Sequence, residues 1–248
     1  LLLDEKQKRT IVDVAEGWAA GLGLIASCLH LNPEAIADTS SSIGEWFSVG
    51  EYFQEVLSRE PKEIHLFLMQ ASILDCLNVD LCDEMIDASG TYETIEYCSD
   101  RGLFLFPDKI DHSSFRLHKL FQEFLRLRYS RTLPEEKRAL HKRAAEIYIG
   151  RECFEPAFDH AIQARDFTNA ATILDKFCLE NAGEGADWRI VVLGRKLPAA
   201  TRNLFPRITL AMAWPLIFRW EFDEAEETLH SCRLRLDEIV QSGDMPAH

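Results

Sequence analysis

The sequence predicts a mainly α-helical protein: a winged-helix domain with a small β-hairpin, followed by a TPR-like α-solenoid, that is, helical repeats of the tetratricopeptide type. Three observations indicate this fold. Apolar residues recur at helical spacing through most of the 248 residues. Two short apolar runs with a polar segment between them interrupt the helices once, near position 110. A pattern of one aromatic and two small or apolar residues then recurs in the second half of the chain.

The composition is that of a globular chain without a basic surface. Hydrophobic residues make up 47% and charged residues 27%, which is enough for a core, and the length predicts two domains. The net charge of −14 disfavours duplex DNA or an anionic membrane as a direct partner. No apolar run reaches the length of a membrane span, and the first residues do not form a signal peptide. We interpret the chain, which begins at Leu1, as an internal fragment of a longer protein.

The seven cysteines are scattered, and none forms a C-x-x-C pair. This distribution predicts reduced, buried thiols, a cytoplasmic location and no metal site. The sequence also lacks the phosphate-loop motif and the G-x-S-x-G nucleophile motif, and its acidic pairs are spread along predicted helices. We therefore expect no catalytic residues and no enzymatic activity in this chain.

The N-terminal part predicts two helices separated by a polar linker. Apolar positions at helical spacing predict a helix over 11–31, which an Asn-Pro pair ends. Three glycines inside this range would weaken an isolated helix, so we expect close packing against another element. Residues 38–44 form the polar linker, and helical spacing resumes over 46–57.

The predicted winged-helix domain occupies about 61–131. Two apolar runs, 103–106 and 115–117, predict a two-stranded β-hairpin with a polar tip. An apolar stripe over 120–129 predicts the closing helix. Three helices precede the hairpin, and Pro61 suits the first position of the first one. Their predicted ranges are 61–71, 79–88 and 92–99.

The C-terminal part repeats one pattern. Phe154, Phe167 and Phe222 are each followed by Ala three positions later, and by Ala or Leu four positions after that. A Phe at a helix start with Ala one turn later lets neighbouring helices approach closely, which is typical of helical-hairpin repeats. The uneven spacing of the three matches predicts a degenerate solenoid. We expect its first helix to begin after Thr132, which can act as the helix cap. We expect the repeated Phe, Ala and Leu residues in its core and His141 on its surface.

The segment from Ser114 to Leu125 contains a basic residue, an apolar residue and His118, and then begins an amphipathic helix. It resembles the sensor of the signal-transduction ATPases with numerous domains (STAND ATPases). The resemblance implies that His118 faces outward and reaches the β-phosphate of ADP, at a helix N-terminus that favours an anion. It also implies that Arg116 and Lys119 add positive potential for nucleotide sensing. Two simpler interpretations stay open: a core or capping role for His118, and plain solvent exposure for Arg116 and Lys119.

Further motifs narrow the resemblance. The stretch Glu16-Gly17-Trp18-Ala19-Ala20-Gly21-Leu22 is similar to the E-G-W-P-A-G-L stretch in the helical lid domain of LuxR-family transcriptional regulators of the maltose-regulon activator type. Ala19 stands where that family usually has proline, which departs from the family pattern. Other matching segments follow in the order of those proteins, at 53–57, 67–75, 102–105 and 140–145.

The resemblance implies three parts: the C-terminal part of the lid of an ATPase module over 1–45, a winged-helix arm over 46–131, and incomplete TPR-like repeats over 132–248. Gly17 and Trp18 of the lid are implied to pack near the nucleotide, although plain packing also explains them.

The implied function is that of a regulatory fragment of an ATP-dependent LuxR-type transcriptional regulator. The winged-helix arm would hold ADP against an N-terminal ATPase core that lies outside this chain, and ADP or ATP would bind only in the full-length parent. The helical repeats would receive an inducer or a protein. DNA would be bound only through a C-terminal helix-turn-helix outside this chain, and the activated parent would self-associate. The alternative is a stand-alone interaction module made of a winged helix and an α-solenoid.

Overall fold

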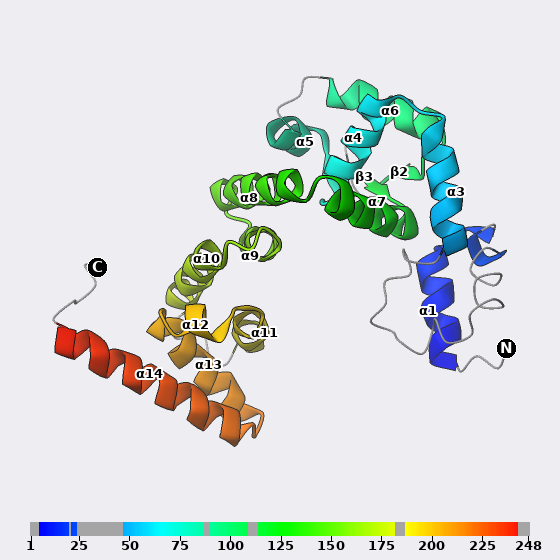
Figure 1. The fold of residues 1–248 in the computed structure, drawn as a ribbon. Coiled ribbons are helices and arrows are strands. Elements are labelled where there is room, and N and C mark those ends of the chain that lie inside the picture. Colours follow the sequence, from blue (N-terminus) through cyan, green and yellow to red (C-terminus); the bar gives the residue numbers. More distant parts are fainter. Residues whose placement is uncertain are drawn as a thin grey trace. The chain divides into compact units, whose positions relative to one another are not determined.

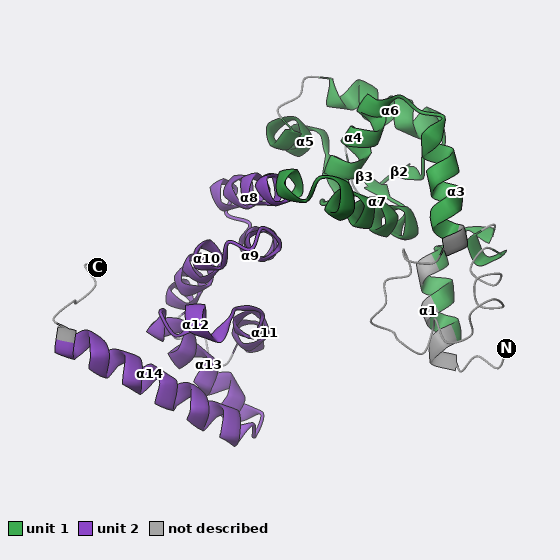
Figure 2. Ribbon diagram, viewed as in Figure 1, with its two compact units in different colours: residues 1–137 green, residues 138–248 purple. Residues whose placement is uncertain are grey.

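A computed structural model of the chain divides into two compact units, 1–137 and 138–248 (Figure 2). The predicted end of the lid, 1–45, falls in the first unit together with the winged helix, and the predicted start of the repeats at 132 lies shortly before the division. The structure describes residues 5–19, 21–23, 47–86, 90–108, 114–181 and 187–242.

The first unit begins with α1 (Glu5–Ala15), which ends at two residues of left-handed backbone, Glu16 at φ 46° and Gly17 at φ 83°. A left-handed conformation cannot continue a right-handed helix. The prediction of one continuous helix over 11–31 is therefore wrong, because the chain breaks at Glu16 and Gly17. The predicted end of that helix and the polar linker 38–44 lie outside the described residues.

The helices of the winged helix confirm the predicted ones within a few residues (Figure 1). Pro61 differs slightly from its prediction, since it occupies the N-cap position before the first helical residue. The side chains of Phe53, Leu68, Ile95 and Phe121 are fully buried between these helices and form the centre of the core. The helices are α3 (Phe47–Ser58), α4 (Lys62–Ala71), α5 (Val79–Ile86), α6 (Thr91–Asp100) and α7 (Lys119–Thr132).

The predicted hairpin is present as β2 (Leu105–Pro107) and β3 (Ser114–Leu117), with Leu105 opposite Leu117. A third strand, β1 (Leu77–Asn78), pairs with the other edge of β3 and gives the strand order β1-β3-β2. The predicted hairpin is therefore confirmed, and β1 is a third strand that the sequence analysis did not predict. With two residues, β1 is too short to show the alternation that reveals a strand in a sequence.

The second unit is helical. Helix α8 (Pro134–Gly150) includes the division between residues 137 and 138, so its first residues belong to the first unit and the rest to the second. The three repeated phenylalanines are each the first residue of a helix, which confirms that part of the repeat pattern. Thr132 does not cap α8, because it still belongs to α7 and its hydroxyl donates to the Arg128 carbonyl at 2.9 Å. The remaining helices are α9 (Phe154–Gln163), α10 (Phe167–Glu180), α11 (Trp188–Lys196), α12 (Ala199–Arg202), α13 (Pro206–Phe218) and α14 (Phe222–Ser242).

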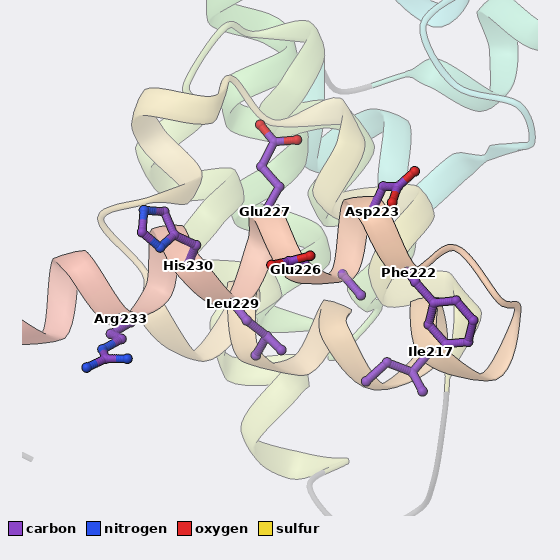
Figure 3. Close-up of a pocket in the computed structure, with 9 residues that line it drawn as sticks. Ile217, Phe222, Asp223, Glu226, Glu227, Leu229, His230 and Arg233 are labelled. Atoms are coloured by element: carbon purple, nitrogen blue, oxygen red, sulfur yellow. The ribbon is translucent and has the colours of Figure 1, made fainter.

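The core of the second unit contains the small residues of the repeats. Ala157, Ala170 and Ala225 are buried, which allows the helices that carry them to pack closely. Phe222 is 52% exposed and Leu229 is 39% exposed, so the prediction that every repeat residue is core is wrong for α14. These two side chains lie on a side of α14 that the described helices leave partly open (Figure 3).

The cysteines follow the sequence prediction in part. Of the described cysteines, Cys82, Cys98, Cys178 and Cys232 are buried, all as free thiols. Cys76 and Cys153 are exposed, which corrects the expectation that the cysteines are buried.

Candidate functional site

His118 is the N-cap residue of α7 and connects this helix to β3. Its Nδ1 accepts a hydrogen bond from the Leu120 N–H at 3.3 Å, and its Nε2 lies 3.1 Å from the Ala15 carbonyl oxygen. Both bonds form together when the ring is neutral with its hydrogen on Nε2. The ring is 3% exposed because the chain that follows α1 covers it. The outward orientation expected from the sequence is therefore wrong, whereas the capping role left open there is confirmed.

Two donors converge on the carboxylate of Glu16, and the His118 ring lies close by. The Arg116 guanidinium donates to both oxygens, at 3.2 and 3.0 Å, and the Lys119 backbone N–H donates to Oε2 at 3.4 Å. The Nε2 atom of His118 lies 3.9 Å from the same Oε2. We call this group the α7 corner: the side chains of Arg116 and His118 and the backbone N–H of Lys119. Its donors and the positive end of α7 together favour one anion.

The predicted nucleotide-sensing residues thus lie together, but not all contribute in the expected way. Arg116 lies on β3 opposite Phe106, and its guanidinium carbon is 5.9 Å from the centre of that ring. Only the backbone of Lys119 enters the α7 corner, and its side chain is exposed. Whether any of these groups contacts a nucleotide stays a prediction.

Trp18 connects the segment after α1 to the winged helix. Its ring centre lies between 5.3 and 5.7 Å from those of Tyr52, Phe53, Phe104 and His118. This is the usual separation of packed aromatic rings, so the plain packing role left open for Trp18 is present. The nucleotide contact implied for Trp18 and for its neighbour at position 17 stays a prediction.

The arrangement can bind an anion but offers no assembled catalytic group. Among the described residues, no cluster of His, Cys, Asp and Glu could hold a metal ion. Burial raises the pKa of the Cys82 and Cys98 thiols to about 12, so both stay protonated and unreactive at neutral pH.

Sequence reasoning missed a buried histidine pair in the second unit. The Nδ1 atoms of His141 and His160 lie 2.9 Å apart, and the Tyr148 ring stacks on His160 with the ring centres 5.4 Å apart. The prediction of a surface position for His141 is wrong, because this face of α8 is covered and His141 is buried. The spacing to Ala145, one helical turn later, is the signal that could have indicated the buried face.

A shallow, open pocket lies along α14 (Figure 3). Ile217 belongs to α13, and the other lining residues belong to α14. Large apolar side chains nearby are also exposed, among them Trp214, Phe218 and Trp220. The lining mixes apolar, acidic and basic groups: Ile217, Phe222, Asp223, Ala225, Glu226, Glu227, Leu229, His230 and Arg233.

In the part of the chain that the structure describes, no helix combines the length and the apolar character needed to cross a membrane.

Comparison with known proteins gives a consistent set of relatives. Residues 53–137 match the family model described as the MalT winged helix domain. The chain is 27% identical to the HTH-type transcriptional regulator MalT of Vibrio parahaemolyticus over 215 residues. The aligned region covers 86% of this chain and 24% of that protein. The chain is 22% identical to the HTH-type transcriptional regulator AlkS of Alcanivorax borkumensis over 241 residues. That aligned region covers 95% of this chain and 27% of that protein.

A third relative is described as a protein kinase rather than as a transcriptional regulator. The serine/threonine-protein kinase PknK of Mycobacterium tuberculosis is 26% identical over 215 residues, which cover 86% of this chain and 19% of the kinase. The chain spans about a quarter or less of the length of these relatives. The matches confirm the resemblance to MalT-type LuxR regulators that the sequence motifs indicated.

Proposed function

We propose that this chain, as a relative of MalT-type transcriptional regulators, is the regulatory part of an ATP-dependent regulator. In this proposal, the winged-helix arm holds ADP against an ATPase core that is not part of these 248 residues. The observation that carries the proposal is the convergence of the Arg116 guanidinium and the Lys119 N–H on one negative charge at the start of α7, beside the His118 ring. A terminal phosphate oxygen of ADP suits the same donors, because charged donors and a helix N-terminus favour phosphate.

The proposal requires two arrangements of the arm. In the arrangement described here, Nε2 of His118 is bonded to the Ala15 carbonyl and the ring is covered. To reach a phosphate, the segment after α1 has to move away from the ring. Ligands that bind one arrangement more tightly shift the populations of the two. ADP favours one arrangement in this scheme, and ATP together with an inducer favours the other.

The helical repeats receive the inducer or a protein partner in this proposal. The open pocket along α14 and the exposed aromatic residues of α13 support a binding role for the second unit. Release of the arm would then permit self-association of the parent, which binds DNA through a helix-turn-helix outside this chain. The pocket and the exposed aromatic residues also support the second candidate function, a stand-alone module that binds a protein or peptide without any nucleotide.

The substitution His118→Asn in the full-length gene product tests the nucleotide role. Asparagine is a good N-cap residue, so the start of α7 keeps its cap while the Nε2–H donor is lost. We expect less ADP to co-purify with the variant and inducer-independent transcription to rise in a reporter assay.

The matched control is His65→Asn, which changes a histidine of α4 whose Nε2 contacts the Leu57 carbonyl. This control should retain ADP and a low basal activity. If His118→Asn behaves as the control does, the nucleotide role of His118 is refuted. A full-length protein that binds a partner but never contains nucleotide would favour the interaction module.

A further inference from the structure

We propose that Glu16 is an intramolecular substitute for phosphate: its carboxylate occupies the α7 corner when no phosphate is bound, and phosphate and Glu16 exclude each other. The inference rests on the proposed function only for the identity of the competing anion. It assigns a regulatory role to Glu16, a residue that the lid motif contains but for which the sequence analysis gave no role.

The first argument is the geometry of the donors. Arg116 Nη1 contacts both carboxylate oxygens, and Oε2 also accepts from the Lys119 N–H and lies near His118 Nε2. A phosphate oxygen would use these same atoms, because the guanidinium and the α7 N-terminus meet at this point. Two anions at one group of donors would repel each other, so only one can be bound at a time.

The second argument is the backbone of Glu16. Its φ of 46° is left-handed, which is costly for a residue with a side chain. This conformation ends α1 and directs the chain toward the winged helix, so that Glu16 reaches Arg116 across 100 positions of sequence. The ion pair with Arg116 and the backbone bond to Lys119 are contacts that offset part of this cost.

The third argument links Glu16 to the rest of the segment. Trp18 lies two residues later in the aromatic cluster of Tyr52, Phe53 and Phe104, and Ala15, one residue earlier, accepts from the His118 ring. Displacement of Glu16 by phosphate therefore loosens contacts on both sides. Occupancy of the α7 corner is in this way coupled to the contact between the end of the lid and the arm.

The ion pair is weak enough to be exchanged. The side chains of Glu16 and Arg116 are partly exposed, 27% and 36%, so water screens their attraction. A multiply charged phosphate bound at the same donors gains more from them than one carboxylate does. Glu16 therefore raises the concentration of phosphate that the arm needs, without blocking the site permanently.

Titration of inorganic pyrophosphate into the 248-residue chain, followed by calorimetry, tests the competition. Glu16→Gln keeps the size of the side chain and removes its charge, so pyrophosphate should bind roughly fivefold more tightly than to the unchanged chain. The control Asp13→Asn removes the same charge from an exposed position on α1 and should leave the affinity within about twofold, because an exposed charge outside the group of donors is screened by water and salt. Arg116→Gln combined with Glu16→Gln should abolish the gain.

A second readout follows the segment itself. Pyrophosphate should speed amide hydrogen exchange in residues 15–19 of the unchanged chain, and Glu16→Gln should show this faster exchange without pyrophosphate. If Glu16→Gln does not fold, Glu16→Asp takes its place in both experiments. Its shorter side chain keeps the charge but reaches the donors less well, so a smaller gain in pyrophosphate affinity is expected, and no gain over Asp13→Asn would overturn the proposal.

Equal pyrophosphate affinity in Glu16→Gln and Asp13→Asn, or no binding to any variant, overturns the proposal. This failure is distinguishable from failure of the proposed function. Loss of ADP in His118→Asn together with unchanged affinity in Glu16→Gln would leave the nucleotide role intact and remove only the competition.

Discussion

Trp18 lies against the winged helix beside a position that has no side chain. A Cβ atom at Gly21 would lie 2.0 Å from Cε3 of the indole, far inside van der Waals contact. The ring cannot move aside easily, because Phe53 and Phe104 pack against it. The glycine at position 21 is therefore required by close packing, which confirms the prediction for this one of the three glycines, whereas a Cβ at Gly17 or Gly23 would meet nothing within 4 Å.

Gly21→Ala should destabilise the first unit by about 1–3 kcal/mol, the usual cost of overpacking a filled site. The control Gly23→Ala should be neutral or stabilise by up to about 1 kcal/mol, since its Cβ would meet nothing within 4 Å and alanine favours helix. Urea unfolding followed by circular dichroism measures both changes. Equal stability of the two variants would show that Trp18 does not occupy the described position.

The candidate site could be predicted from the sequence only in part. The motif around His118 identified the N-cap of α7 and Arg116, because both lie within a short local pattern. Glu16 could not be connected to them, since 100 positions separate it from Arg116 and no local pattern joins the two. The orientation of His118 could not be predicted either, because it depends on the break after Ala15.

At the scale of the elements, Glu60, which follows the end of α3, connects this part of the chain to α6. Its carboxylate accepts from the Tyr97 hydroxyl at 2.8 Å and pairs with Arg101 at 3.0 Å. The hydrogen bond from Tyr97, followed by the bond and charge of Arg101, lowers the pKa of Glu60 below its ordinary 4.5. A lowered folded-state pKa means that the stability contributed by this group is present above pH 4.5 and is lost as pH falls through the lowered pKa.

Glu60→Gln should therefore lower the melting temperature of the first unit near neutral pH. The difference from the unchanged chain should shrink as pH falls from 4.5 through the lowered pKa, below which the Glu60 carboxylate is protonated in the folded protein too. Thermal melts over a pH series measure this difference. Glu96→Gln, at an exposed position of α6, is the control. A difference that is constant with pH would contradict the ionic role of Glu60.

The helices were largely predictable, because apolar spacing reports which face of a helix is buried, and tertiary packing in the winged helix agrees with it. The three phenylalanines that begin α9, α10 and α14 were visible for the same reason. The exceptions have physical causes. The short β1 forms through its pairing with β3. Helix α1 is followed by left-handed Glu16 and Gly17, and the apolar spacing that continues past them concealed this break.

At the scale of the whole molecule, the chain contains two units with separate cores. In the second unit, α11 and α13 approach each other at Gly194, where a Cβ atom would lie 2.4 Å from Sδ of the buried Met212. Gly194 and Gly21 thus offer one close-packed glycine in each unit. Mutations at distant sites with no shared partners act independently, so each substitution reports on its own unit.

Gly21→Ala and Gly194→Ala should therefore shift different parts of the unfolding curve. Scanning calorimetry of the 248-residue chain should show two transitions, because units with their own cores unfold separately unless a large interface couples them. Gly21→Ala should lower only one transition and Gly194→Ala only the other, the latter by a smaller amount because the Met212 side chain can shift. Gly150→Ala, whose Cβ would meet nothing within 4 Å, should lower neither. A single transition that both substitutions lower together would mean that the two units unfold as one, and that a ligand bound to the repeats could act on the arm through shared stability rather than through release of the arm.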